Sequence, residues 1–355
     1  VVIDADYVFD IEVLSNGKIL FAYLEGETAY LKSTKDGNNF SAPTELPIGD
    51  AMSINSDSDL IIESLGKIAT IIGEARDNES VHLFSWTSNK TQSSWTKKVV
   101  TDDLFPDSKF DDCEYLSDLC YHSVTSLTFG QNAKGQQTVV ARVLVSNEGS
   151  DPTTDQWTNF AFQRKSATSN WKSPQMLDNF GPEEVNSHAY RVAPLIVTPK
   201  GKTAFAYEKG FNDDPHAIQI FVSSGFGKKF VQKDQGRLSS VYGTVVPYLA
   251  NEGEKIFTAF NMYTDSEDHS HPDVYFGEVG KLNKAKRVGV SGSHRLTTFA
   301  RLNGKFTVVS ESESNGKWTV QIRKLNGKKW SSPKRILVDP NDFGTTPWDS
   351  GCETS

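Results

Sequence analysis

The stretch Ser33–Leu46, STKDGNNFSAPTEL, decides the fold. Its Asp36-Gly37 pair is a strong signal for a tight turn, because glycine adopts positive φ without steric cost. Phe40 and the run Ser41-Ala42-Pro43 follow this pair. One isolated hairpin would account for the stretch, unless the same pattern returns elsewhere in the chain.

The pattern does return. An aromatic residue followed by small residues and proline recurs at Trp171-Lys172-Ser173-Pro174 and at Trp330-Ser331-Ser332-Pro333, with weaker copies at Trp95 and Phe230 and one near Lys281. Three short β-rich runs precede each copy; in the first unit they read YVFDIEVL, KILFAYL and TAYLKST. Each unit therefore contains four short strands in roughly 45–75 residues, a period typical of propellers and arrays. Short strands between regular turn signals indicate an all-β chain.

We predict an all-β fold, a six-bladed β-propeller with four antiparallel strands per blade. A hairpin-rich sandwich, which would also contain Asx-Gly turns, is the alternative. The propeller is expected to span residues 1–338, and residues 339–355 form a C-terminal tail. The expected blades are residues 1–50, 51–102, 121–178, 190–237, 241–291 and 293–338.

The repeated turn resembles the Asp-box (BNR) repeat of propellers in the sialidase superfamily, which combines Ser or Thr, Asp, Gly and an aromatic residue. The first unit departs from it because Asp36 and Gly37 are adjacent, and Asn326 stands in place of the Asp in the last unit. A sialidase would also need three arginines that hold a carboxylate, a Tyr–Glu nucleophile pair and an Asp acid/base. Arg191 and Arg295 supply two arginines, and the first blade has none in YVFDIEVL. The resemblance therefore implies the propeller without a recognisable sialidase catalytic set.

Charge and composition limit the partners. The chain has 355 residues and a net charge of −8, and it contains no basic stripe of the kind that binds phosphate backbones, so we expect no nucleic acid. No apolar run approaches the ~20 residues that span a bilayer. Sequons at Asn78 and Asn89, and Cys113 and Cys120 on either side of a short loop, favour an extracellular or secreted glycoprotein. We expect a monomer.

The candidate site lies where the blades are linked. In a propeller, the links between blades and the loops between second and third strands surround the mouth of the channel, where binding sites normally lie. Every histidine except His82 maps to these loops or beside them. The candidate catalytic residues are His122, His188, Tyr190, Arg191, Tyr242, His294 and Arg295, and the candidate substrate-binding residues are Tyr121, Glu184, Asp112 and His216. Packing and salt bridges between blades would explain the arginines and tyrosines equally well.

These residue types suit a carbohydrate-active enzyme. A lyase needs a cation such as Arg191 or Arg295 to neutralise the carboxylate of a uronate, a base such as His188 and an acid such as Tyr190. This set is similar in residue type to that of propeller polysaccharide lyases. We therefore predict a lyase or glycosidase acting on an extracellular anionic glycan. The alternative is a non-catalytic lectin or adhesin that binds glycans with or without Ca²⁺, although the loops differ between blades and so favour one asymmetric site.

One loop also suggests a metal site. Asp265, His269, His271 and Asp273 crowd the expected loop between the second and third strands of blade five. Imidazole and carboxylate groups are ligands for Zn²⁺, and carboxylates alone suit Ca²⁺. The alternative is a solvated acidic loop, and the expected chemistry requires no cofactor.

Overall fold

In the computed structural model, the described residues are 7–26, 28–48, 52–54, 60–76, 81–101, 120–147, 156–180, 194–209, 217–237, 247–263, 272–288, 295–314 and 317–337. Within these ranges the only helical element is the short 3₁₀ helix η5 (Leu282–Lys284), and the rest is strand, turn or irregular. The all-β prediction is confirmed. No helix among the described residues is long and apolar enough to cross a membrane.

The strands form six antiparallel sheets in chain order, each with four strands, and the sixth sheet has one additional short strand. The first three sheets contain β1 (Tyr7–Val13), β2 (Ile19–Glu25), β3 (Thr28–Thr34) and β4 (Thr44–Glu45); β5 (Leu60–Leu65), β6 (Ile68–Arg76), β7 (Val81–Ser88) and β8 (Trp95–Thr101); and β9 (Cys120–Gln131), β10 (Gln137–Asn147), β11 (Gln156–Arg164) and β12 (Gln175–Phe180).

The last three sheets follow the same order. They contain β13 (Leu195–Val197), β14 (Thr203–Lys209), β15 (Ala217–Ser223) and β16 (Phe230–Arg237); β17 (Tyr248–Glu252), β18 (Lys255–Tyr263), β19 (Pro272–Glu278) and β20 (Lys286–Arg287); and β21 (Arg295–Leu302), β22 (Lys305–Ser314), β23 (Lys317–Asn326), β24 (Lys329–Trp330) and β25 (Lys334–Leu337). In the sixth sheet both β24 and β25 pair with β23.

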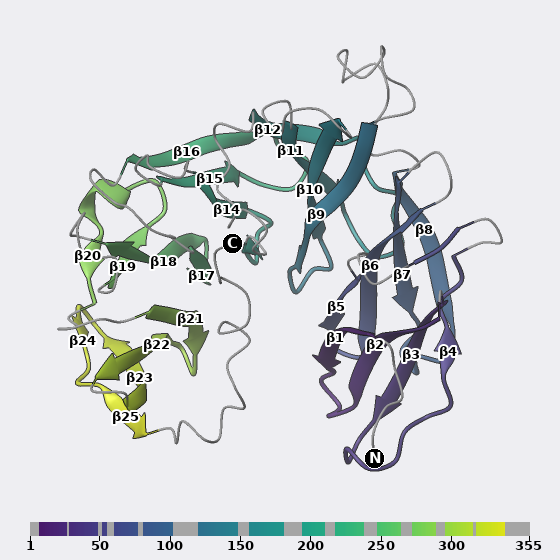
Figure 1. The fold of residues 1–355 in the computed structure, drawn as a ribbon, viewed down its shortest axis with the longest axis horizontal. Coiled ribbons are helices and arrows are strands. Elements are labelled where there is room, and N and C mark those ends of the chain that lie inside the picture. The colour runs from purple at the N-terminus through teal and green to yellow at the C-terminus, as the bar shows by residue number, and fades with distance from the viewer. Residues whose placement is uncertain are drawn as a thin grey trace, which may run out of the picture.

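The sheets follow one another around a central space, and the first and sixth lie at the two ends of the arc (Figure 1). The first strands of successive sheets are in contact, so that β1 meets β5, β5 meets β9, β9 meets β13, β13 meets β17 and β17 meets β21. The first strand of each sheet is therefore the inner one, and the fourth is the outer one. This radial order is that of a β-propeller.

The hydrophobic core lies between consecutive sheets. Each junction buries a cluster of apolar side chains drawn from both neighbours: Leu20 with Ile62, Leu83 with Leu127, Val140 with Phe221, Ile220 with Phe260, and Ala259 with Phe299. At the first junction the indole Nε1 of the fully buried Trp86 donates to the carbonyl of Pro47 at 2.9 Å. The packing there is so close that a Cβ on Gly73 would overlap Leu60.

The turn at Asp36 forms as predicted. One carboxylate oxygen of Asp36 accepts the backbone N–H groups of Asn38 at 2.9 Å and Asn39 at 2.8 Å, and Gly37 has φ of 75°. These hydrogen bonds hold the pKa of the Asp36 carboxyl well below its ordinary value. Phe40 packs against Phe21, with ring centroids 5.5 Å apart. The polar turn is thus attached to the first sheet by its aromatic residue.

The antiparallel order gives the molecule two faces. Turns from the first to the second strand and from the third to the fourth strand of each sheet lie on one side, which we call the turn face. The opposite ends of the strands, where the second strand ends and the third begins and where one sheet leads to the next, define the other side, the loop face. The connections between these strand ends lie mostly outside the described ranges.

Candidate functional site

Most of the predicted site residues lie outside the described residues: His188, Tyr190, Arg191, Tyr242, His294, Glu184, Asp112, His216, Asp265, His269 and His271. Their roles stay predictions. The described residues place the strand ends at the loop face, together with four members of the predicted set.

Three of these four lie on inner strands. Tyr121 and His122 are the second and third residues of β9, where they pair with Ser146 and Val145 of β10. Arg295 is the first residue of β21, and its backbone lies opposite Glu311 in the antiparallel pairing with β22. His122 is therefore part of the strand, close to the link between sheets beside which the sequence placed it. The inner strands of the third and sixth sheets thus each present a predicted site residue at their loop-face end.

The fourth member, Asp273, belongs to an ion pair. Its carboxylate lies 2.5 Å from the guanidinium of Arg287 on the adjacent strand β20, and its side chain is only 8% exposed. Burial raises the pKa of the neighbouring Tyr275 phenol, and Asp273 adds to this effect while Arg287 opposes it. Within the described ranges, no group of three or more His, Cys, Asp or Glu side chains is arranged to hold a metal ion. Asp273 therefore has a cationic partner within its own sheet.

Two buried arginines were missed by the sequence reasoning. Arg142 of β10 is 2% exposed; its Nε donates to the side-chain oxygen of Asn159 at 3.1 Å, and its guanidinium lies 4.8 Å from the ring centroid of Tyr207 in the fourth sheet. A guanidinium can stack on an aromatic face and so lie against apolar surroundings. Arg142 thus links the third and fourth sheets.

Arg164 of β11 has a similar role near the turn face. Its three nitrogens donate to neutral oxygens, those of Gln137 at 2.5 Å and of Ser85 and Thr87 at 3.2 Å each. Trp171, the aromatic residue of the repeated turn, lies 4.5 Å from the guanidinium and also donates to Ser85. Burial lowers the pKa of Arg164 to about 10. The sequence gives no signal for this cation, because its partners lie about 30 and 80 residues away, in neighbouring strands and sheets.

Three carboxylates gather on the inner strands of the first two sheets, and we call them the inner-strand carboxylates: Asp10, Glu12 and Glu63. Asp10 accepts the backbone N–H of Ile62 at 2.8 Å. Glu12 accepts the N–H of Ser64 at 3.0 Å and its hydroxyl at 2.5 Å. These two carboxylates therefore fix β1 against β5.

Glu63 has the most strongly perturbed carboxyl of the three. Burial raises its pKa to about 8, the negative charges of Glu12 and Asp10 add to the rise, and a hydrogen bond from the backbone of Gln131 opposes it. Burial also raises the pKa of Asp10. A carboxyl group that stays protonated at neutral pH can donate a proton, which is the property required of a general acid. Its only sequence signal is an acid within the apolar run LIIESL.

Comparison with known proteins places the fold. No family profile and no curated protein matches the chain. Among solved structures, an ulvan lyase described as representing a new polysaccharide lyase family, PL25, has a TM-score of 0.54 at 10% identity, over 94% of this chain and 80% of that chain. An ulvan lyase structure bound to -[GlcA(1-4)Rha3S]- gives 0.44 at 9% identity, over 94% and 86% of the two chains.

A sialidase is also similar. The sialidase of Trypanosoma rangeli, in complex with sialic acid, has a TM-score of 0.37 at 12% identity, over 90% of this chain and 55% of that chain. At such identities the comparison concerns the fold rather than the chemistry. The chain thus has the β-propeller fold that it shares with ulvan lyase.

Proposed function

We propose that this chain is a secreted enzyme that cleaves an anionic polysaccharide by elimination, at a site on the loop face. In this proposal the six sheets are six blades of one propeller, formed by residues 1–338, and residues 339–355 are a tail. The support for it is the fold shared with a polysaccharide lyase, together with His122 and Arg295 at the loop-face ends of two inner strands.

The chemistry assigns one role to each residue type. Arg191 or Arg295 would neutralise the carboxylate of a uronate, which makes the adjacent C–H bond more acidic. His122, His188 or His294 would take that proton, and the electron pair would form the new carbon–carbon double bond as the bond to the leaving oxygen breaks. Tyr190 or Tyr242 would protonate that oxygen. The products would be a new reducing end and an unsaturated uronate.

The inner-strand carboxylates favour a second candidate, a glycoside hydrolase. Such an enzyme needs one carboxyl group with a raised pKa as acid and a second, ionised carboxylate as base or nucleophile. Glu63, with its pKa raised to about 8, suits the acid, and Glu12, whose charge contributes more to that rise than the charge of Asp10, is the candidate for the second role. In this case hydrolysis would take place within the central space rather than at the loop face.

The first experiment is product release from soluble anionic and neutral polysaccharides, ulvan and alginate among them. Reducing ends and the ultraviolet absorbance of unsaturated uronates are measured together, with and without chelator. The lyase predicts that both signals rise in parallel and that His122→Ala and Arg295→Ala abolish both. Ile336→Ala, a change at an exposed position of the outer strand β25, is the control and should leave them unchanged.

The other outcomes separate the alternatives. Reducing ends without absorbance would replace the lyase by the hydrolase, and Glu63→Gln should then abolish them. Retention of the protein on a glycan column without any product would leave a lectin, with Tyr121, Glu184, Asp112 and His216 as candidate sugar contacts. Loss of that retention with chelator would point to a cation at Asp265, His269 and His271.

A further inference from the structure

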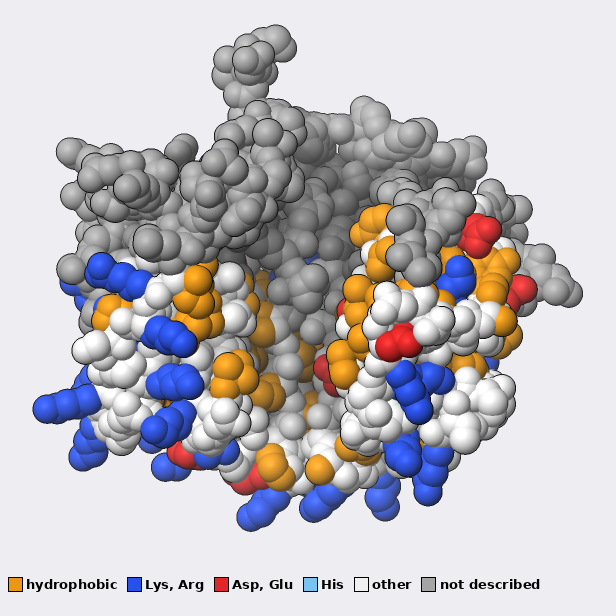
Figure 2. Space-filling model, turned by 90° about the horizontal axis from the view of Figure 1, so that it is seen from below, with side chains coloured by type: hydrophobic (Ala, Val, Ile, Leu, Met, Phe, Trp, Pro, Cys, Tyr) orange, Lys and Arg blue, Asp and Glu red, His pale blue; other side chains and the backbone are white. Residues whose placement is uncertain are grey.

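Many of the described lysines lie in the turns of the turn face. The sequence shows no basic run, because these lysines are separated by whole strands. In the structure every sheet contributes at least one exposed lysine to its turns: Lys35, Lys90, Lys134, Lys228, Lys284 and Lys328. Figure 2 shows Lys and Arg side chains along one rim of the molecule, with few acidic side chains among them. Since the net charge of the whole chain is −8, the positive charge of this face must be outweighed by negative charge elsewhere in the chain.

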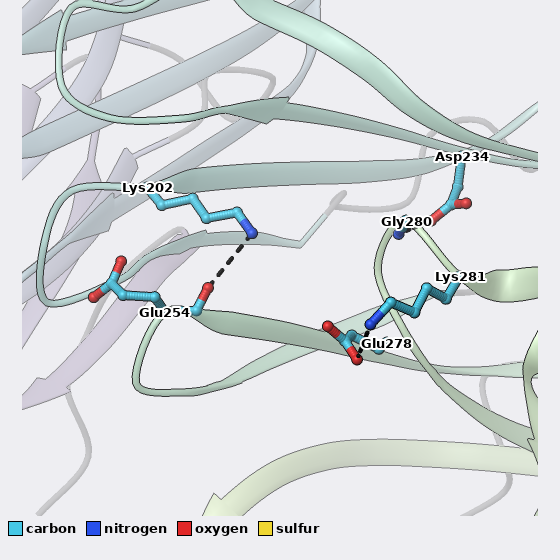
Figure 3. Close-up of polar contacts among 6 residues, drawn as sticks. All are labelled: Lys202, Asp234, Glu254, Glu278, Gly280 and Lys281. Carbon is cyan, nitrogen blue, oxygen red and sulfur yellow. Dashed lines mark hydrogen bonds and ion pairs between the residues drawn. The ribbon is translucent and has the colours of Figure 1, made fainter.

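The carboxylates in or beside these turns already have partners. Asp36 accepts hydrogen bonds within its own turn. Glu254 accepts from the Thr198 hydroxyl at 2.6 Å and from the backbone of Lys200 at 2.9 Å. Glu278 pairs with Lys281 at 2.9 Å, as Figure 3 shows. The acidic groups of this face are thus engaged locally and neutralise few of its lysines.

One pocket opens on this face, at the junction of the third and fourth sheets. It has a volume of roughly 250 Å³, and its charged lining consists of Lys172, Lys228 and Lys229. All three side chains are exposed, and none forms an ion pair with a described residue. The turns that carry them, residues 165–174 and 224–229, come from two adjacent sheets. Three lysine side chains therefore line one concave site, and no described carboxylate forms an ion pair with them.

The frame of the pocket is fixed by two glutamines. Gln175 of β12 accepts the N–H of Phe230 at 2.9 Å and donates to its carbonyl at 3.1 Å, which joins the third sheet to the fourth. Gln163 accepts the N–H of Gly227 at 2.9 Å. Gly227 has φ of 70°, and a Cβ there would overlap the ammonium group of Lys172. The absence of a side chain at Gly227 therefore lets Lys172 lie across the turn, 4.9 Å from the ring of Phe226.

From these contacts we infer that this pocket, the three-lysine pocket, binds a sulfate or carboxylate group of an acidic polysaccharide whose chain extends across the turn face. Sites that enclose a whole ligand usually measure about 300–1,000 Å³, so the pocket suits one anionic group rather than an entire oligosaccharide. The remaining lysines of the face would hold the rest of the polymer by weaker, screened attraction. The inference rests on the proposed function for the choice of polymer, and it adds a docking site remote from the loop face.

The test is direct binding of the whole chain to ulvan, with a neutral dextran for comparison, at about 50 mM salt, where surface charges are little screened. The triple variant Lys172→Gln/Lys228→Gln/Lys229→Gln removes the pocket charges. The triple variant Lys35→Gln/Lys90→Gln/Lys328→Gln removes as much charge from three other sheets. From the binding free energy that exposed ion pairs ordinarily contribute, we expect the first variant to weaken binding about tenfold or more and the second about threefold or less.

A single variant tests the geometry without changing the charge. Gly227→Ala should displace the Lys172 ammonium group and weaken binding several-fold, while circular dichroism confirms that the protein is folded. Inorganic sulfate should compete with ulvan for the unmodified protein and less effectively for the Gly227→Ala variant. Equal losses of ulvan affinity in the two triple variants would refute the three-lysine pocket as a specific binding site. Equally strong binding of single-stranded DNA would refute it as well, because either result would mean general attraction between charges.

The binding readout separates this inference from the proposed function. Pocket-dependent binding without any product would refute the enzyme and leave the docking site. Product release with no change in binding or KM in the pocket variant would refute the docking site and leave the enzyme.

Discussion

Glu63 links the structure to a measurable dependence of stability on pH. Its carboxyl lies on the inner strand β5 beside Asp10 and Glu12, and burial raises its pKa from the ordinary 4.5 to about 8. The folded state therefore prefers the protonated form. The stabilising contribution of that form is complete below about pH 4.5 and is lost as the pH rises through about 8.

The magnitude follows from the size of the pKa change. Each pKa unit corresponds to about 1.4 kcal/mol, so the rise to about 8 sets an upper limit near 5 kcal/mol. Glu63 is only partly buried, and solvent reduces this value to an expected loss of about 2–3 kcal/mol between about pH 5 and pH 9. Glu63→Gln keeps the shape and the acceptor oxygen for the backbone of Gln131, but it cannot ionise. The free energy of unfolding of this variant should equal that of the unmodified protein at about pH 5 and should be larger at about pH 9.

The assay is urea unfolding at a series of pH values, with Asp36→Asn as control. The pKa of Asp36 is lowered, so its contribution is present above its ordinary pKa and is lost only as the pH falls. The free energy of unfolding of the control should therefore change with pH in the same way as that of the unmodified protein from about pH 6 to pH 9. If the free energy of unfolding of Glu63→Gln also changes with pH as that of the unmodified protein does, Glu63 is ionised in the folded protein and the reasoning from its burial is wrong.

Three further changes have defined outcomes. Arg164→Leu should destabilise the protein by about 3 kcal/mol, because it leaves the buried hydrogen-bonding partners of the guanidinium unsatisfied, and it should alter the fluorescence of Trp171; an unchanged urea midpoint would contradict this. Gly73→Ala should cost about 1–3 kcal/mol, since the new Cβ overlaps Leu60, and an equal or higher Tm would show that the junction can relax. Asp273→Asn should lower the pKa of the Tyr275 phenol, measured by ultraviolet titration of tyrosinate, and a constant titration curve would remove Asp273 as a cause.

The sequence predicted the strands well because their signals are local. The run TAYLKST coincides with β3 (Thr28–Thr34), and the turn that follows it has the positive φ that Gly37 permits. Alternation of apolar and polar residues depends on neighbours two positions apart, and a tight turn depends on a few adjacent residues. Repetition of this local pattern predicted units of four strands, and the structure confirms them.

The candidate site was predictable only in part. His122 and Arg295 could be assigned to the beginnings of the third and sixth units because their place in the repeat fixes the unit, and the structure places both on inner strands. Glu63 could not be singled out, since its raised pKa comes first from burial in the folded chain and then from Glu12 and Asp10, which lie more than fifty residues earlier in the chain. Arg164 was missed for the same reason, because the oxygens around it belong to two other strands, β7 and β10.

The sequence by itself determined the strands, their turns and the repeat, because these depend on residues that are close together in the chain. Only the tertiary structure decided how charge is distributed over the molecule. Lysines such as Lys172 and Lys228 are far apart in sequence and look like ordinary solvated turn residues. The radial stacking of sheets brings their turns to one face and into one pocket, and the Coulomb interaction depends on that distance in space rather than on separation along the chain.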